Sequence, residues 1–266
     1  MKPTLDFIKD MATHAGKILL SYAESEDLDI QRKGQTDLVT EADHASEEYL
    51  IDVITKTFPN HAIVAEESGG RAGDTDHQWY IDPLDGTLNY AHGVPIYCVS
   101  IGYAYQGELT LGVVYDPTRD EYYCAERGQG ATLNGKPIHV SKFTDLIDCM
   151  LVTGFPYDLA DAPDNNNANF IRFNAVARTV RRLGSAALDM VYVAAGRMDG
   201  FWELEIFQYD VAAAGLIVRE AGGVVTDVYG NHDFMAKPVT ICCANPTIHQ
   251  KMLDVLADVR ARREAV

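Results

Sequence analysis

Apolar residues recur at helical spacing near both ends of the chain and in several segments between them. In the first half this spacing predicts a helix over about residues 4–23 and a second helix from about Thr40 to just before Pro59. In the second half, helices are predicted soon after residue 170, from Gly184-Ser185 to Gly196, over 209–223, and from about Thr247 onward.

Apolar runs bounded by turn residues predict strands between these helices. In the first half they cover 61–67, 78–81, 101–105, 108–115, 121–126 and 136–140, and 69–77 is predicted to be a loop. Asn134-Gly135 is a strong hairpin signal, because both residues tolerate positive φ. In the second half, strands are predicted at 179–183, 198–207, 224–231 (with a turn) and 239–245.

The order of these elements predicts an α/β (α+β) protein with helices layered on sheets. A β meander fills much of the first half, and helices alternate with strands in the second. The polar stretch 156–170 is the best loop between them. We therefore expect one compact unit of two halves, residues 1–150 and 151–266.

The composition argues against some classes of function but does not identify one. The 266 residues include 39 acidic and 22 basic side chains, a formal charge of −17, so the chain is predicted to bind neither nucleic acid nor an anionic membrane. No apolar run reaches the roughly 18 residues of a membrane span, and the charged N-terminus is unlike a signal peptide. The five cysteines form no CxxC pair, which predicts buried free thiols and a cytoplasmic location.

The stretch WYIDPLDGTLNY has potential metal and phosphate ligands at the end of a predicted strand. Pro83 fixes its own φ and holds the preceding residue extended, so Asp82, the Leu84 carbonyl and Asp85 can turn toward one point. Hard oxygen ligands in a compact turn suit Mg²⁺. Backbone N–H groups at Gly86 and Thr87, where a short helix is predicted to begin, suit a phosphate.

A purely structural interpretation is open for each acidic residue taken alone. Asp82 and Asp85 are common turn and cap residues, Asp43 stands in a capping-box position after Thr40, and Asp210 could be an N-cap. Glu66 could be a solvent-facing strand end. Their joint placement at strand ends and helix starts favours a shared site, because α/β folds gather ligands there.

Five motifs resemble those of the inositol monophosphatase family, in its order and spacing over nearly the whole chain. They are DLVTEAD at 37–43, AEES at 65–68, DPLDGTLNY at 82–90, RRLGSAALD at 181–189 and YDVAAAGLIVREAGG at 209–223. The resemblance implies a layered αβαβα sandwich of the inositol monophosphatase/fructose-bisphosphatase type. It also implies Mg²⁺-dependent, lithium-sensitive hydrolysis of a phosphate monoester, with two or three Mg²⁺ per active site, by a homodimer.

The resemblance also assigns roles residue by residue. A first metal would be held by Glu66, Asp82, the Leu84 carbonyl and Asp85, a second by Asp82, Asp85 and Asp210, and a weaker third by Glu66. Thr87, supported by Asp43, would orient the attacking water. Substrate contacts would come from Lys33, Asp85, Gly86, Thr87, Gly184, Ser185, Ala186, Glu203 and Asp210.

The substrate is less well defined than the chemistry. Tyr209 stands where the family usually has Trp, which can alter substrate fit but not metal binding. A small phosphorylated polyol, myo-inositol monophosphate, is the leading expectation. Fructose 1,6-bisphosphate, histidinol phosphate, NADP and phosphoadenosine phosphate are alternatives with the same chemistry. A different class of function is a regulatory binding protein in transcription or ribosome assembly.

Overall fold

The structure is a computed structural model that describes residues 1–23, 30–32, 38–156 and 165–264. The helices in these ranges are α1 (Leu5–Ala23), α2 (Glu41–Thr57), α3 (Thr87–Ala91), the 3-10 helix η1 (Leu146–Asp148), α4 (Asn167–Val176), α5 (Ala186–Ala194), α6 (Gln208–Glu220) and α7 (Pro246–Glu264). None of these helices is long and apolar enough to cross a membrane.

The first sheet has seven strands in chain order. They are β3 (His61–Ala65), β4 (Asp74–Asp85), β5 (Cys98–Tyr105), β6 (Glu108–Asp116), β7 (Glu121–Glu126), β8 (Ala131–Leu133) and β9 (Lys136–Pro137). Strands β3 and β4 pair parallel, and every later neighbour pairs antiparallel. The predicted hairpin turn joins β8 to β9, with φ of 49° at Asn134 and 75° at Gly135.

The second sheet has five strands in the order β11-β10-β12-β14-β13. They are β10 (Met150–Thr153), β11 (Thr179–Arg181), β12 (Gly200–Ile206), β13 (Val224–Thr226) and β14 (Val239–Ala244). Strand β10 runs parallel to both neighbours, and β14 runs antiparallel to both of its own. A separate two-stranded sheet pairs β1 (Ile30–Arg32) with β2 (Leu38–Thr40).

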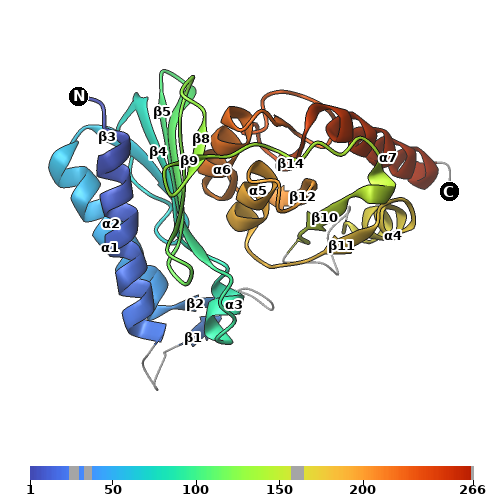
Figure 1. The fold of residues 1–266 in the computed structure, drawn as a ribbon. Coiled ribbons are helices and arrows are strands. Elements are labelled where there is room, and N and C mark those ends of the chain that lie inside the picture. The colour runs from blue at the N-terminus through green and yellow to red at the C-terminus, as the bar shows by residue number, and fades with distance from the viewer. Residues whose placement is uncertain (24–29, 33–37, 157–164, 265–266) are drawn as a thin grey trace.

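The elements stack as five alternating layers, which confirms the predicted αβαβα sandwich (Figure 1). Helices α1 and α2 cover one face of the first sheet, because α1 turns Ile8, Met11, Ala12, Ala15 and Leu19 toward it. Helices α5 and α6 lie between the two sheets, and α4 and α7 cover the outer face of the second. The division at residue 150 stays a prediction.

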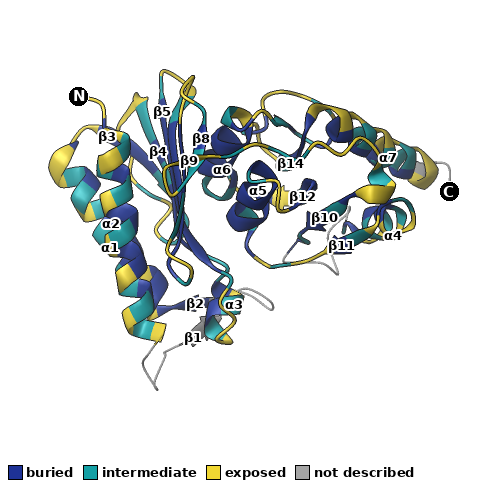
Figure 2. Cartoon of the chain, viewed as in Figure 1, coloured by how far each residue is buried: buried dark blue, intermediate teal, exposed yellow. Residues whose placement is uncertain are grey.

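Helix α6 is packed tightly against the first sheet, and its central residues are buried (Figure 2). Glycines on the sheet allow this approach. A Cβ at Gly112 would lie 2.7 Å from the Ala213 carbonyl oxygen, and one at Gly102 would lie 3.0 Å from the Ala213 nitrogen. Side chains at these positions would push the helix away, so the two glycines fix the distance between sheet and helix.

Several local predictions were wrong. Residues 74–77 belong to β4 rather than to a loop, and their polar side chains hid this strand. The predicted strand 136–140 is paired only at Lys136–Pro137, and β8 was missed. Strand β10 was also missed, because its apolar run is four residues long. The predicted loop 156–170 contains the start of α4, and part of it lies outside the described residues.

Candidate active site

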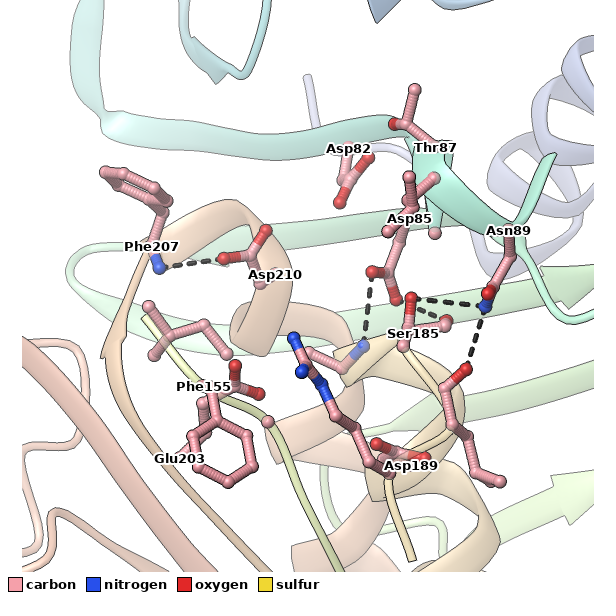
Figure 3. Close-up of a pocket in the computed structure, with 18 of the residues that line it drawn as sticks. Asp82, Asp85, Thr87, Asn89, Phe155, Ser185, Asp189, Glu203, Phe207 and Asp210 are labelled. Atoms are coloured by element: carbon pink, nitrogen blue, oxygen red, sulfur yellow. Dashed lines mark hydrogen bonds between the residues drawn. The ribbon is translucent and has the colours of Figure 1, made fainter. Parts of the chain in front are cut away.

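A cavity of about 470 Å³ opens where strand ends of both sheets meet the first turns of α3, α5 and α6. Its lining includes eleven of the predicted site residues: Glu66, Asp82, Leu84, Asp85, Gly86, Thr87, Gly184, Ser185, Ala186, Glu203 and Asp210. Figure 3 shows the carboxylates of Asp82, Asp85 and Asp210 directed toward a common space. Residues distant in sequence therefore form one acidic pocket.

The turn at the end of β4 is fixed by its own side chains and by α2. Oδ1 of Asp82 accepts a hydrogen bond from the Leu84 N–H at 3.0 Å, as in an Asx turn. The Ser46 hydroxyl, from α2, donates to the Pro83 carbonyl at 3.0 Å. Asp82 is only 2% exposed, so its carboxylate is positioned with little contact to bulk water.

Thr87 begins α3 and is tied to the start of α2. Its hydroxyl lies 3.0 Å from Oδ1 of Asp43 and 3.0 Å from the Leu84 carbonyl, and it is the donor to either acceptor. Oδ2 of Asp43 accepts from the Thr40 N–H and hydroxyl, which completes the predicted capping box. Asp43 is fully buried and does not line the cavity, so it acts behind Thr87.

Asp85 links the first sheet to the start of α5. Its carboxylate accepts hydrogen bonds from the Ser185 hydroxyl at 2.6 Å and from the Ala186 and Ala187 N–H groups at 3.1 and 2.7 Å. Ser185 is also the N-cap of α5, and its oxygen accepts from the Leu188 N–H. Ser185 therefore both caps α5 and lines the cavity.

Asp210 lies in the first turn of α6, and Phe207 occupies the N-cap position, so the N-cap interpretation of Asp210 was wrong. Oδ2 of Asp210 accepts from the Phe207 N–H at 2.8 Å. This bond holds the carboxylate at the helix N-terminus, where the helix dipole favours negative charge. Its position lets it face the cavity opposite the β4 turn (Figure 3).

Glu66 follows β3, in a loop held by the buried carboxylate of Glu47 from α2. Oε2 of Glu47 accepts from the Glu67 N–H and Oε1 from the Ser68 N–H, each at 2.8 Å. Glu47 is 3% exposed, so both bonds are shielded from water. Glu66 is half-buried and lies in the cavity wall.

The far side of the cavity carries Glu203 and Asp189 (Figure 3), and Arg182 also lines the cavity. Glu203 can lie there because residue 154 is a glycine: a Cβ at Gly154 would collide with the Glu203 carboxylate. The Arg182 guanidinium stacks over the Phe155 ring, 5.0 Å from its centroid. This part of the wall thus combines acidic, cationic and aromatic groups.

The crowding of acidic groups shifts their pKa values upward. Burial, then repulsion from Glu66, Asp85 and Asp210, raises the pKa of Asp82 well above its ordinary range. Burial, then repulsion from Glu66 and Asp85, does the same to the pKa of Asp210. Burial raises the pKa of Glu203 to about 8. Excess negative charge of this kind is what a bound cation would relieve.

The chemistry of the donors fits Mg²⁺ and not zinc. Carboxylates and the Leu84 carbonyl are hard oxygen ligands, and no His or Cys is among the residues that line the cavity. In the described ranges, no group of three or more His, Cys, Asp or Glu side chains lies in an arrangement that could hold a metal ion as it stands. Both oxygens of Asp85 accept hydrogen bonds from the start of α5.

One of the predicted site residues that the structure describes does not line the cavity. Asp43 lies behind Thr87, and Lys33 lies outside the described residues. Sequence reasoning also missed several lining residues, namely Asn89, Phe155, Arg182, Asp189 and Phe207. The RRLGSAALD motif was a signal for Arg182 and Asp189, but nothing local marked Phe155 or Phe207.

Asn89 connects two segments that lie beside the cavity. Its side-chain amide donates to the carbonyls of Ile96 and Leu183 at 2.9 and 2.8 Å, and so joins α3 to the loop before α5.

Comparison with known proteins identifies the family. The model of the inositol monophosphatase family matches residues 1–261. The chain belongs to the inositol monophosphatase family. It is 43% identical over 261 residues to Nus factor SuhB of Escherichia coli (strain K12), covering 97% of each chain. It is 47% identical over 231 residues to an inositol-1-monophosphatase of Synechocystis sp., covering 86% of this chain and 80% of that relative.

A solved structure agrees with this membership. The structure of inositol monophosphatase from Anabaena (Nostoc) sp. superposes with a TM-score of 0.85 at 42% identity, covering 96% of each chain. This member of the family therefore has the family fold, as its motifs predicted. The relatives carry two kinds of name, an enzyme and a Nus factor, and both bear on what this chain does.

Proposed function

We propose that this protein is a Mg²⁺-dependent phosphatase that hydrolyses the phosphate monoester of a small polyol, with myo-inositol monophosphate as the leading substrate. The observation that carries the proposal is the convergence of Glu66, Asp82, Asp85 and Asp210 on one cavity beside Thr87. Family membership supports the same reaction. Fructose 1,6-bisphosphate, histidinol phosphate, NADP and phosphoadenosine phosphate stay alternative substrates.

Magnesium would be held by Glu66, Asp82, the Leu84 carbonyl, Asp85 and Asp210, in two or three sites. When bound, it would neutralise phosphate charge, lower the pKa of water and stabilise the leaving alkoxide. The pocket has the hard oxygens that this chemistry needs, and the repulsion that raises the pKa of Asp82 and Asp210 favours cation binding.

Thr87 is placed to orient the attacking water. Its hydroxyl has one proton, which it donates inward to Asp43 or to the Leu84 carbonyl. Its oxygen lone pairs then accept a hydrogen bond from a water on the cavity side. That water would direct its own lone pair toward the phosphorus, while Asp43 stays buried and keeps the threonine in one rotamer.

The remaining residues divide between the two ends of the substrate. Backbone N–H groups of Gly86 and Thr87 would hold the phosphoryl oxygens. The polyol would contact Glu203 and the Gly184–Ala186 turn, which Asp85 holds against the first sheet. No covalent intermediate with the protein is required, since positioning and charge stabilisation supply the catalysis. Lithium inhibition, a homodimer and a cytoplasmic location belong to the same proposal, from the family resemblance.

A substrate panel tests the proposal. Purified protein is freed of metal and assayed for phosphate release from the five candidate substrates, with and without Mg²⁺. We expect Mg²⁺-dependent release that is fastest with myo-inositol monophosphate. Faster release from another candidate would change the substrate and keep the reaction, whereas no release from any of them would overturn the proposal.

A regulatory role is a second candidate, favoured by the Nus factor name of the Escherichia coli relative. It would use the outer surface rather than the cavity, so it is compatible with catalysis. The test is a pull-down of transcription and ribosome-assembly proteins from lysate with the tagged chain, with and without Mg²⁺. Recovery of those proteins would support the role, and their absence in both conditions would contradict it.

A further inference from the structure

Asp189 is a buried acid in the cavity wall with no role in the chemistry described above. It lies one helical turn after Ser185, because its N–H donates to the Ser185 carbonyl at 2.9 Å. Its side chain is among those that line the cavity, and Figure 3 draws it on the side away from Asp82 and Thr87. It therefore faces the space that the leaving group would fill.

The side chain lacks the hydrogen bonds that its burial requires. Asp189 is 1% exposed, and its Oδ1 makes no hydrogen bond to any described residue. The other aspartates of the cavity differ: Asp82 accepts one backbone N–H, Asp210 accepts one, and Asp85 accepts from four donors. A buried acceptor left without a partner destabilises the folded protein, so such a group usually has a partner in the functional state.

The neighbouring charges limit what that partner can be. Glu203 and Asp85 are close enough to repel the Asp189 carboxyl. An anionic group such as the phosphate is therefore unfavourable at this position. A neutral hydroxyl can donate to Oδ1 without adding charge, and a polyol has several hydroxyls.

We propose that Asp189 is a specificity residue of the proposed phosphatase, whose Oδ1 accepts a hydrogen bond from a hydroxyl of the polyol leaving group. The inference rests on the proposed function and goes beyond it by placing a polyol contact at the inner wall, next to Glu203. It explains why the free protein keeps an unsatisfied acid there: the substrate supplies the missing donor.

The test compares Asp189→Leu with wild type on two substrates. Leucine has the same branching as aspartate, but its two methyl groups accept no hydrogen bond. For myo-inositol 1-phosphate, we expect KM to rise about tenfold with little change in kcat, as for loss of one hydrogen bond made equally in ground and transition states. For p-nitrophenyl phosphate, whose leaving group has no hydroxyl to donate, KM should change far less. The ratio of the two kcat/KM values should therefore fall about tenfold.

Two further variants separate recognition from structure. Asp189→Asn keeps an acceptor oxygen, so its ratio of kcat/KM values should stay within about threefold of wild type. Asn169→Leu is a matched control, because Oδ1 of Asn169 is also buried without a partner among the described residues but Asn169 does not line the cavity. That control should leave the ratio unchanged. The melting temperature of free Asp189→Leu should rise, since an unsatisfied buried acid is removed.

Three outcomes would count against the inference. An unchanged ratio in Asp189→Leu would overturn it, and so would equal losses on both substrates, which indicate a structural role. A ratio that falls as far in Asn169→Leu would do the same. If the wild-type protein released phosphate from neither substrate, the proposed function itself would fail, and the inference with it.

Discussion

The Thr87 hydroxyl lies 3.0 Å from Oδ1 of Asp43, although 44 positions separate the two residues along the chain. The same aspartate caps α2 through its other oxygen. A single buried carboxylate thus links the stability of a helix to the orientation of a side chain at the reaction centre.

Replacing Asp43 by asparagine should reduce both catalysis and stability. The amide offers an N–H group where the threonine needs an acceptor, so Thr87 can rotate and present the wrong atom to water. We expect kcat to fall about a hundredfold, as for loss of a positioned proton-handling group. Phosphate-release kinetics and thermal unfolding measure the two effects.

Thr40→Ala is the control for the capping function. It removes the cap hydroxyl but leaves Asp43 available to Thr87, so it should cost about 1 kcal/mol of stability with kcat nearly intact. Normal turnover in Asp43→Asn would exclude Asp43 from the mechanism.

Magnesium should stabilise the folded protein, because it relieves repulsion among the acidic groups of the cavity. At about 100 times its Kd, one bound ion adds about 2.7 kcal/mol to the free energy of unfolding. Asp82→Asn should fold normally by circular dichroism but lose both this stabilisation and Mg²⁺-dependent phosphate release. The melting temperature with and without Mg²⁺ is the measurement.

Asp199→Asn is the matched control for Asp82→Asn. Asp199 is also buried, but its carboxylate accepts from the Met150 N–H outside the cavity. Its variant should keep the Mg²⁺-induced rise in melting temperature. A full rise in Asp82→Asn would show that the ion binds elsewhere.

The raised pKa of Glu203 should make the stability of the metal-free protein depend on pH. Its pKa is raised from 4.5 to about 8, mainly by burial, so the folded state binds a proton that the unfolded state releases within that range. Stability contributed by this group is therefore lost as pH rises from about 4.5 to about 8. Glu203→Gln removes the titration, so the variant should gain stability relative to wild type as pH rises.

The check is the difference in melting temperature between Glu203→Gln and wild type, measured at several pH values without metal. We expect a difference that grows between pH 5 and pH 8 and then levels off. A difference that is constant with pH would mean that Glu203 keeps its ordinary pKa in the folded protein.

Glu47 should affect metal affinity without touching the cavity. Its carboxylate holds the Glu67 and Ser68 N–H groups and so fixes the loop that carries Glu66. Glu47→Gln can accept only one of these bonds. We expect the Mg²⁺ concentration for half-maximal rate to rise about tenfold, as for other groups that orient metal ligands. The neighbouring, exposed Glu48→Gln should leave it unchanged, and equal effects in both variants would contradict the positioning role.

Local chemistry made part of this site predictable. The Asp82–Thr87 turn was expected because Pro83 restricts the chain and Gly86 is a common turn residue, and the structure has Gly86 at a φ of 100° and α3 beginning at Thr87. The capping box at Thr40 and Asp43 follows from residues three apart in sequence.

The remaining contacts depend on segments far apart in sequence. The hydrogen bonds of Asp85 to Ser185, of Glu47 to Ser68 and of Asn89 to Leu183 appear only when the layers assemble. The same is true of β10, whose four residues become a strand because β11 and β12 flank it. The spacing of apolar residues describes one helix or strand at a time, so it could not reveal contacts between distant segments.

The glycines beneath α6 have a consequence for how this protein can change. The helix carries Asp210 at its first turn, and Gly102 and Gly112 set how near it rests to the first sheet. A methyl group added at Gly112 would displace α6 from the first sheet and move Asp210 away from Asp82. The proposed catalysis therefore depends on Gly102 and Gly112 as well as on the residues of the cavity. Substitutions at these two glycines would be limited by the required position of Asp210 as much as by the stability of the fold.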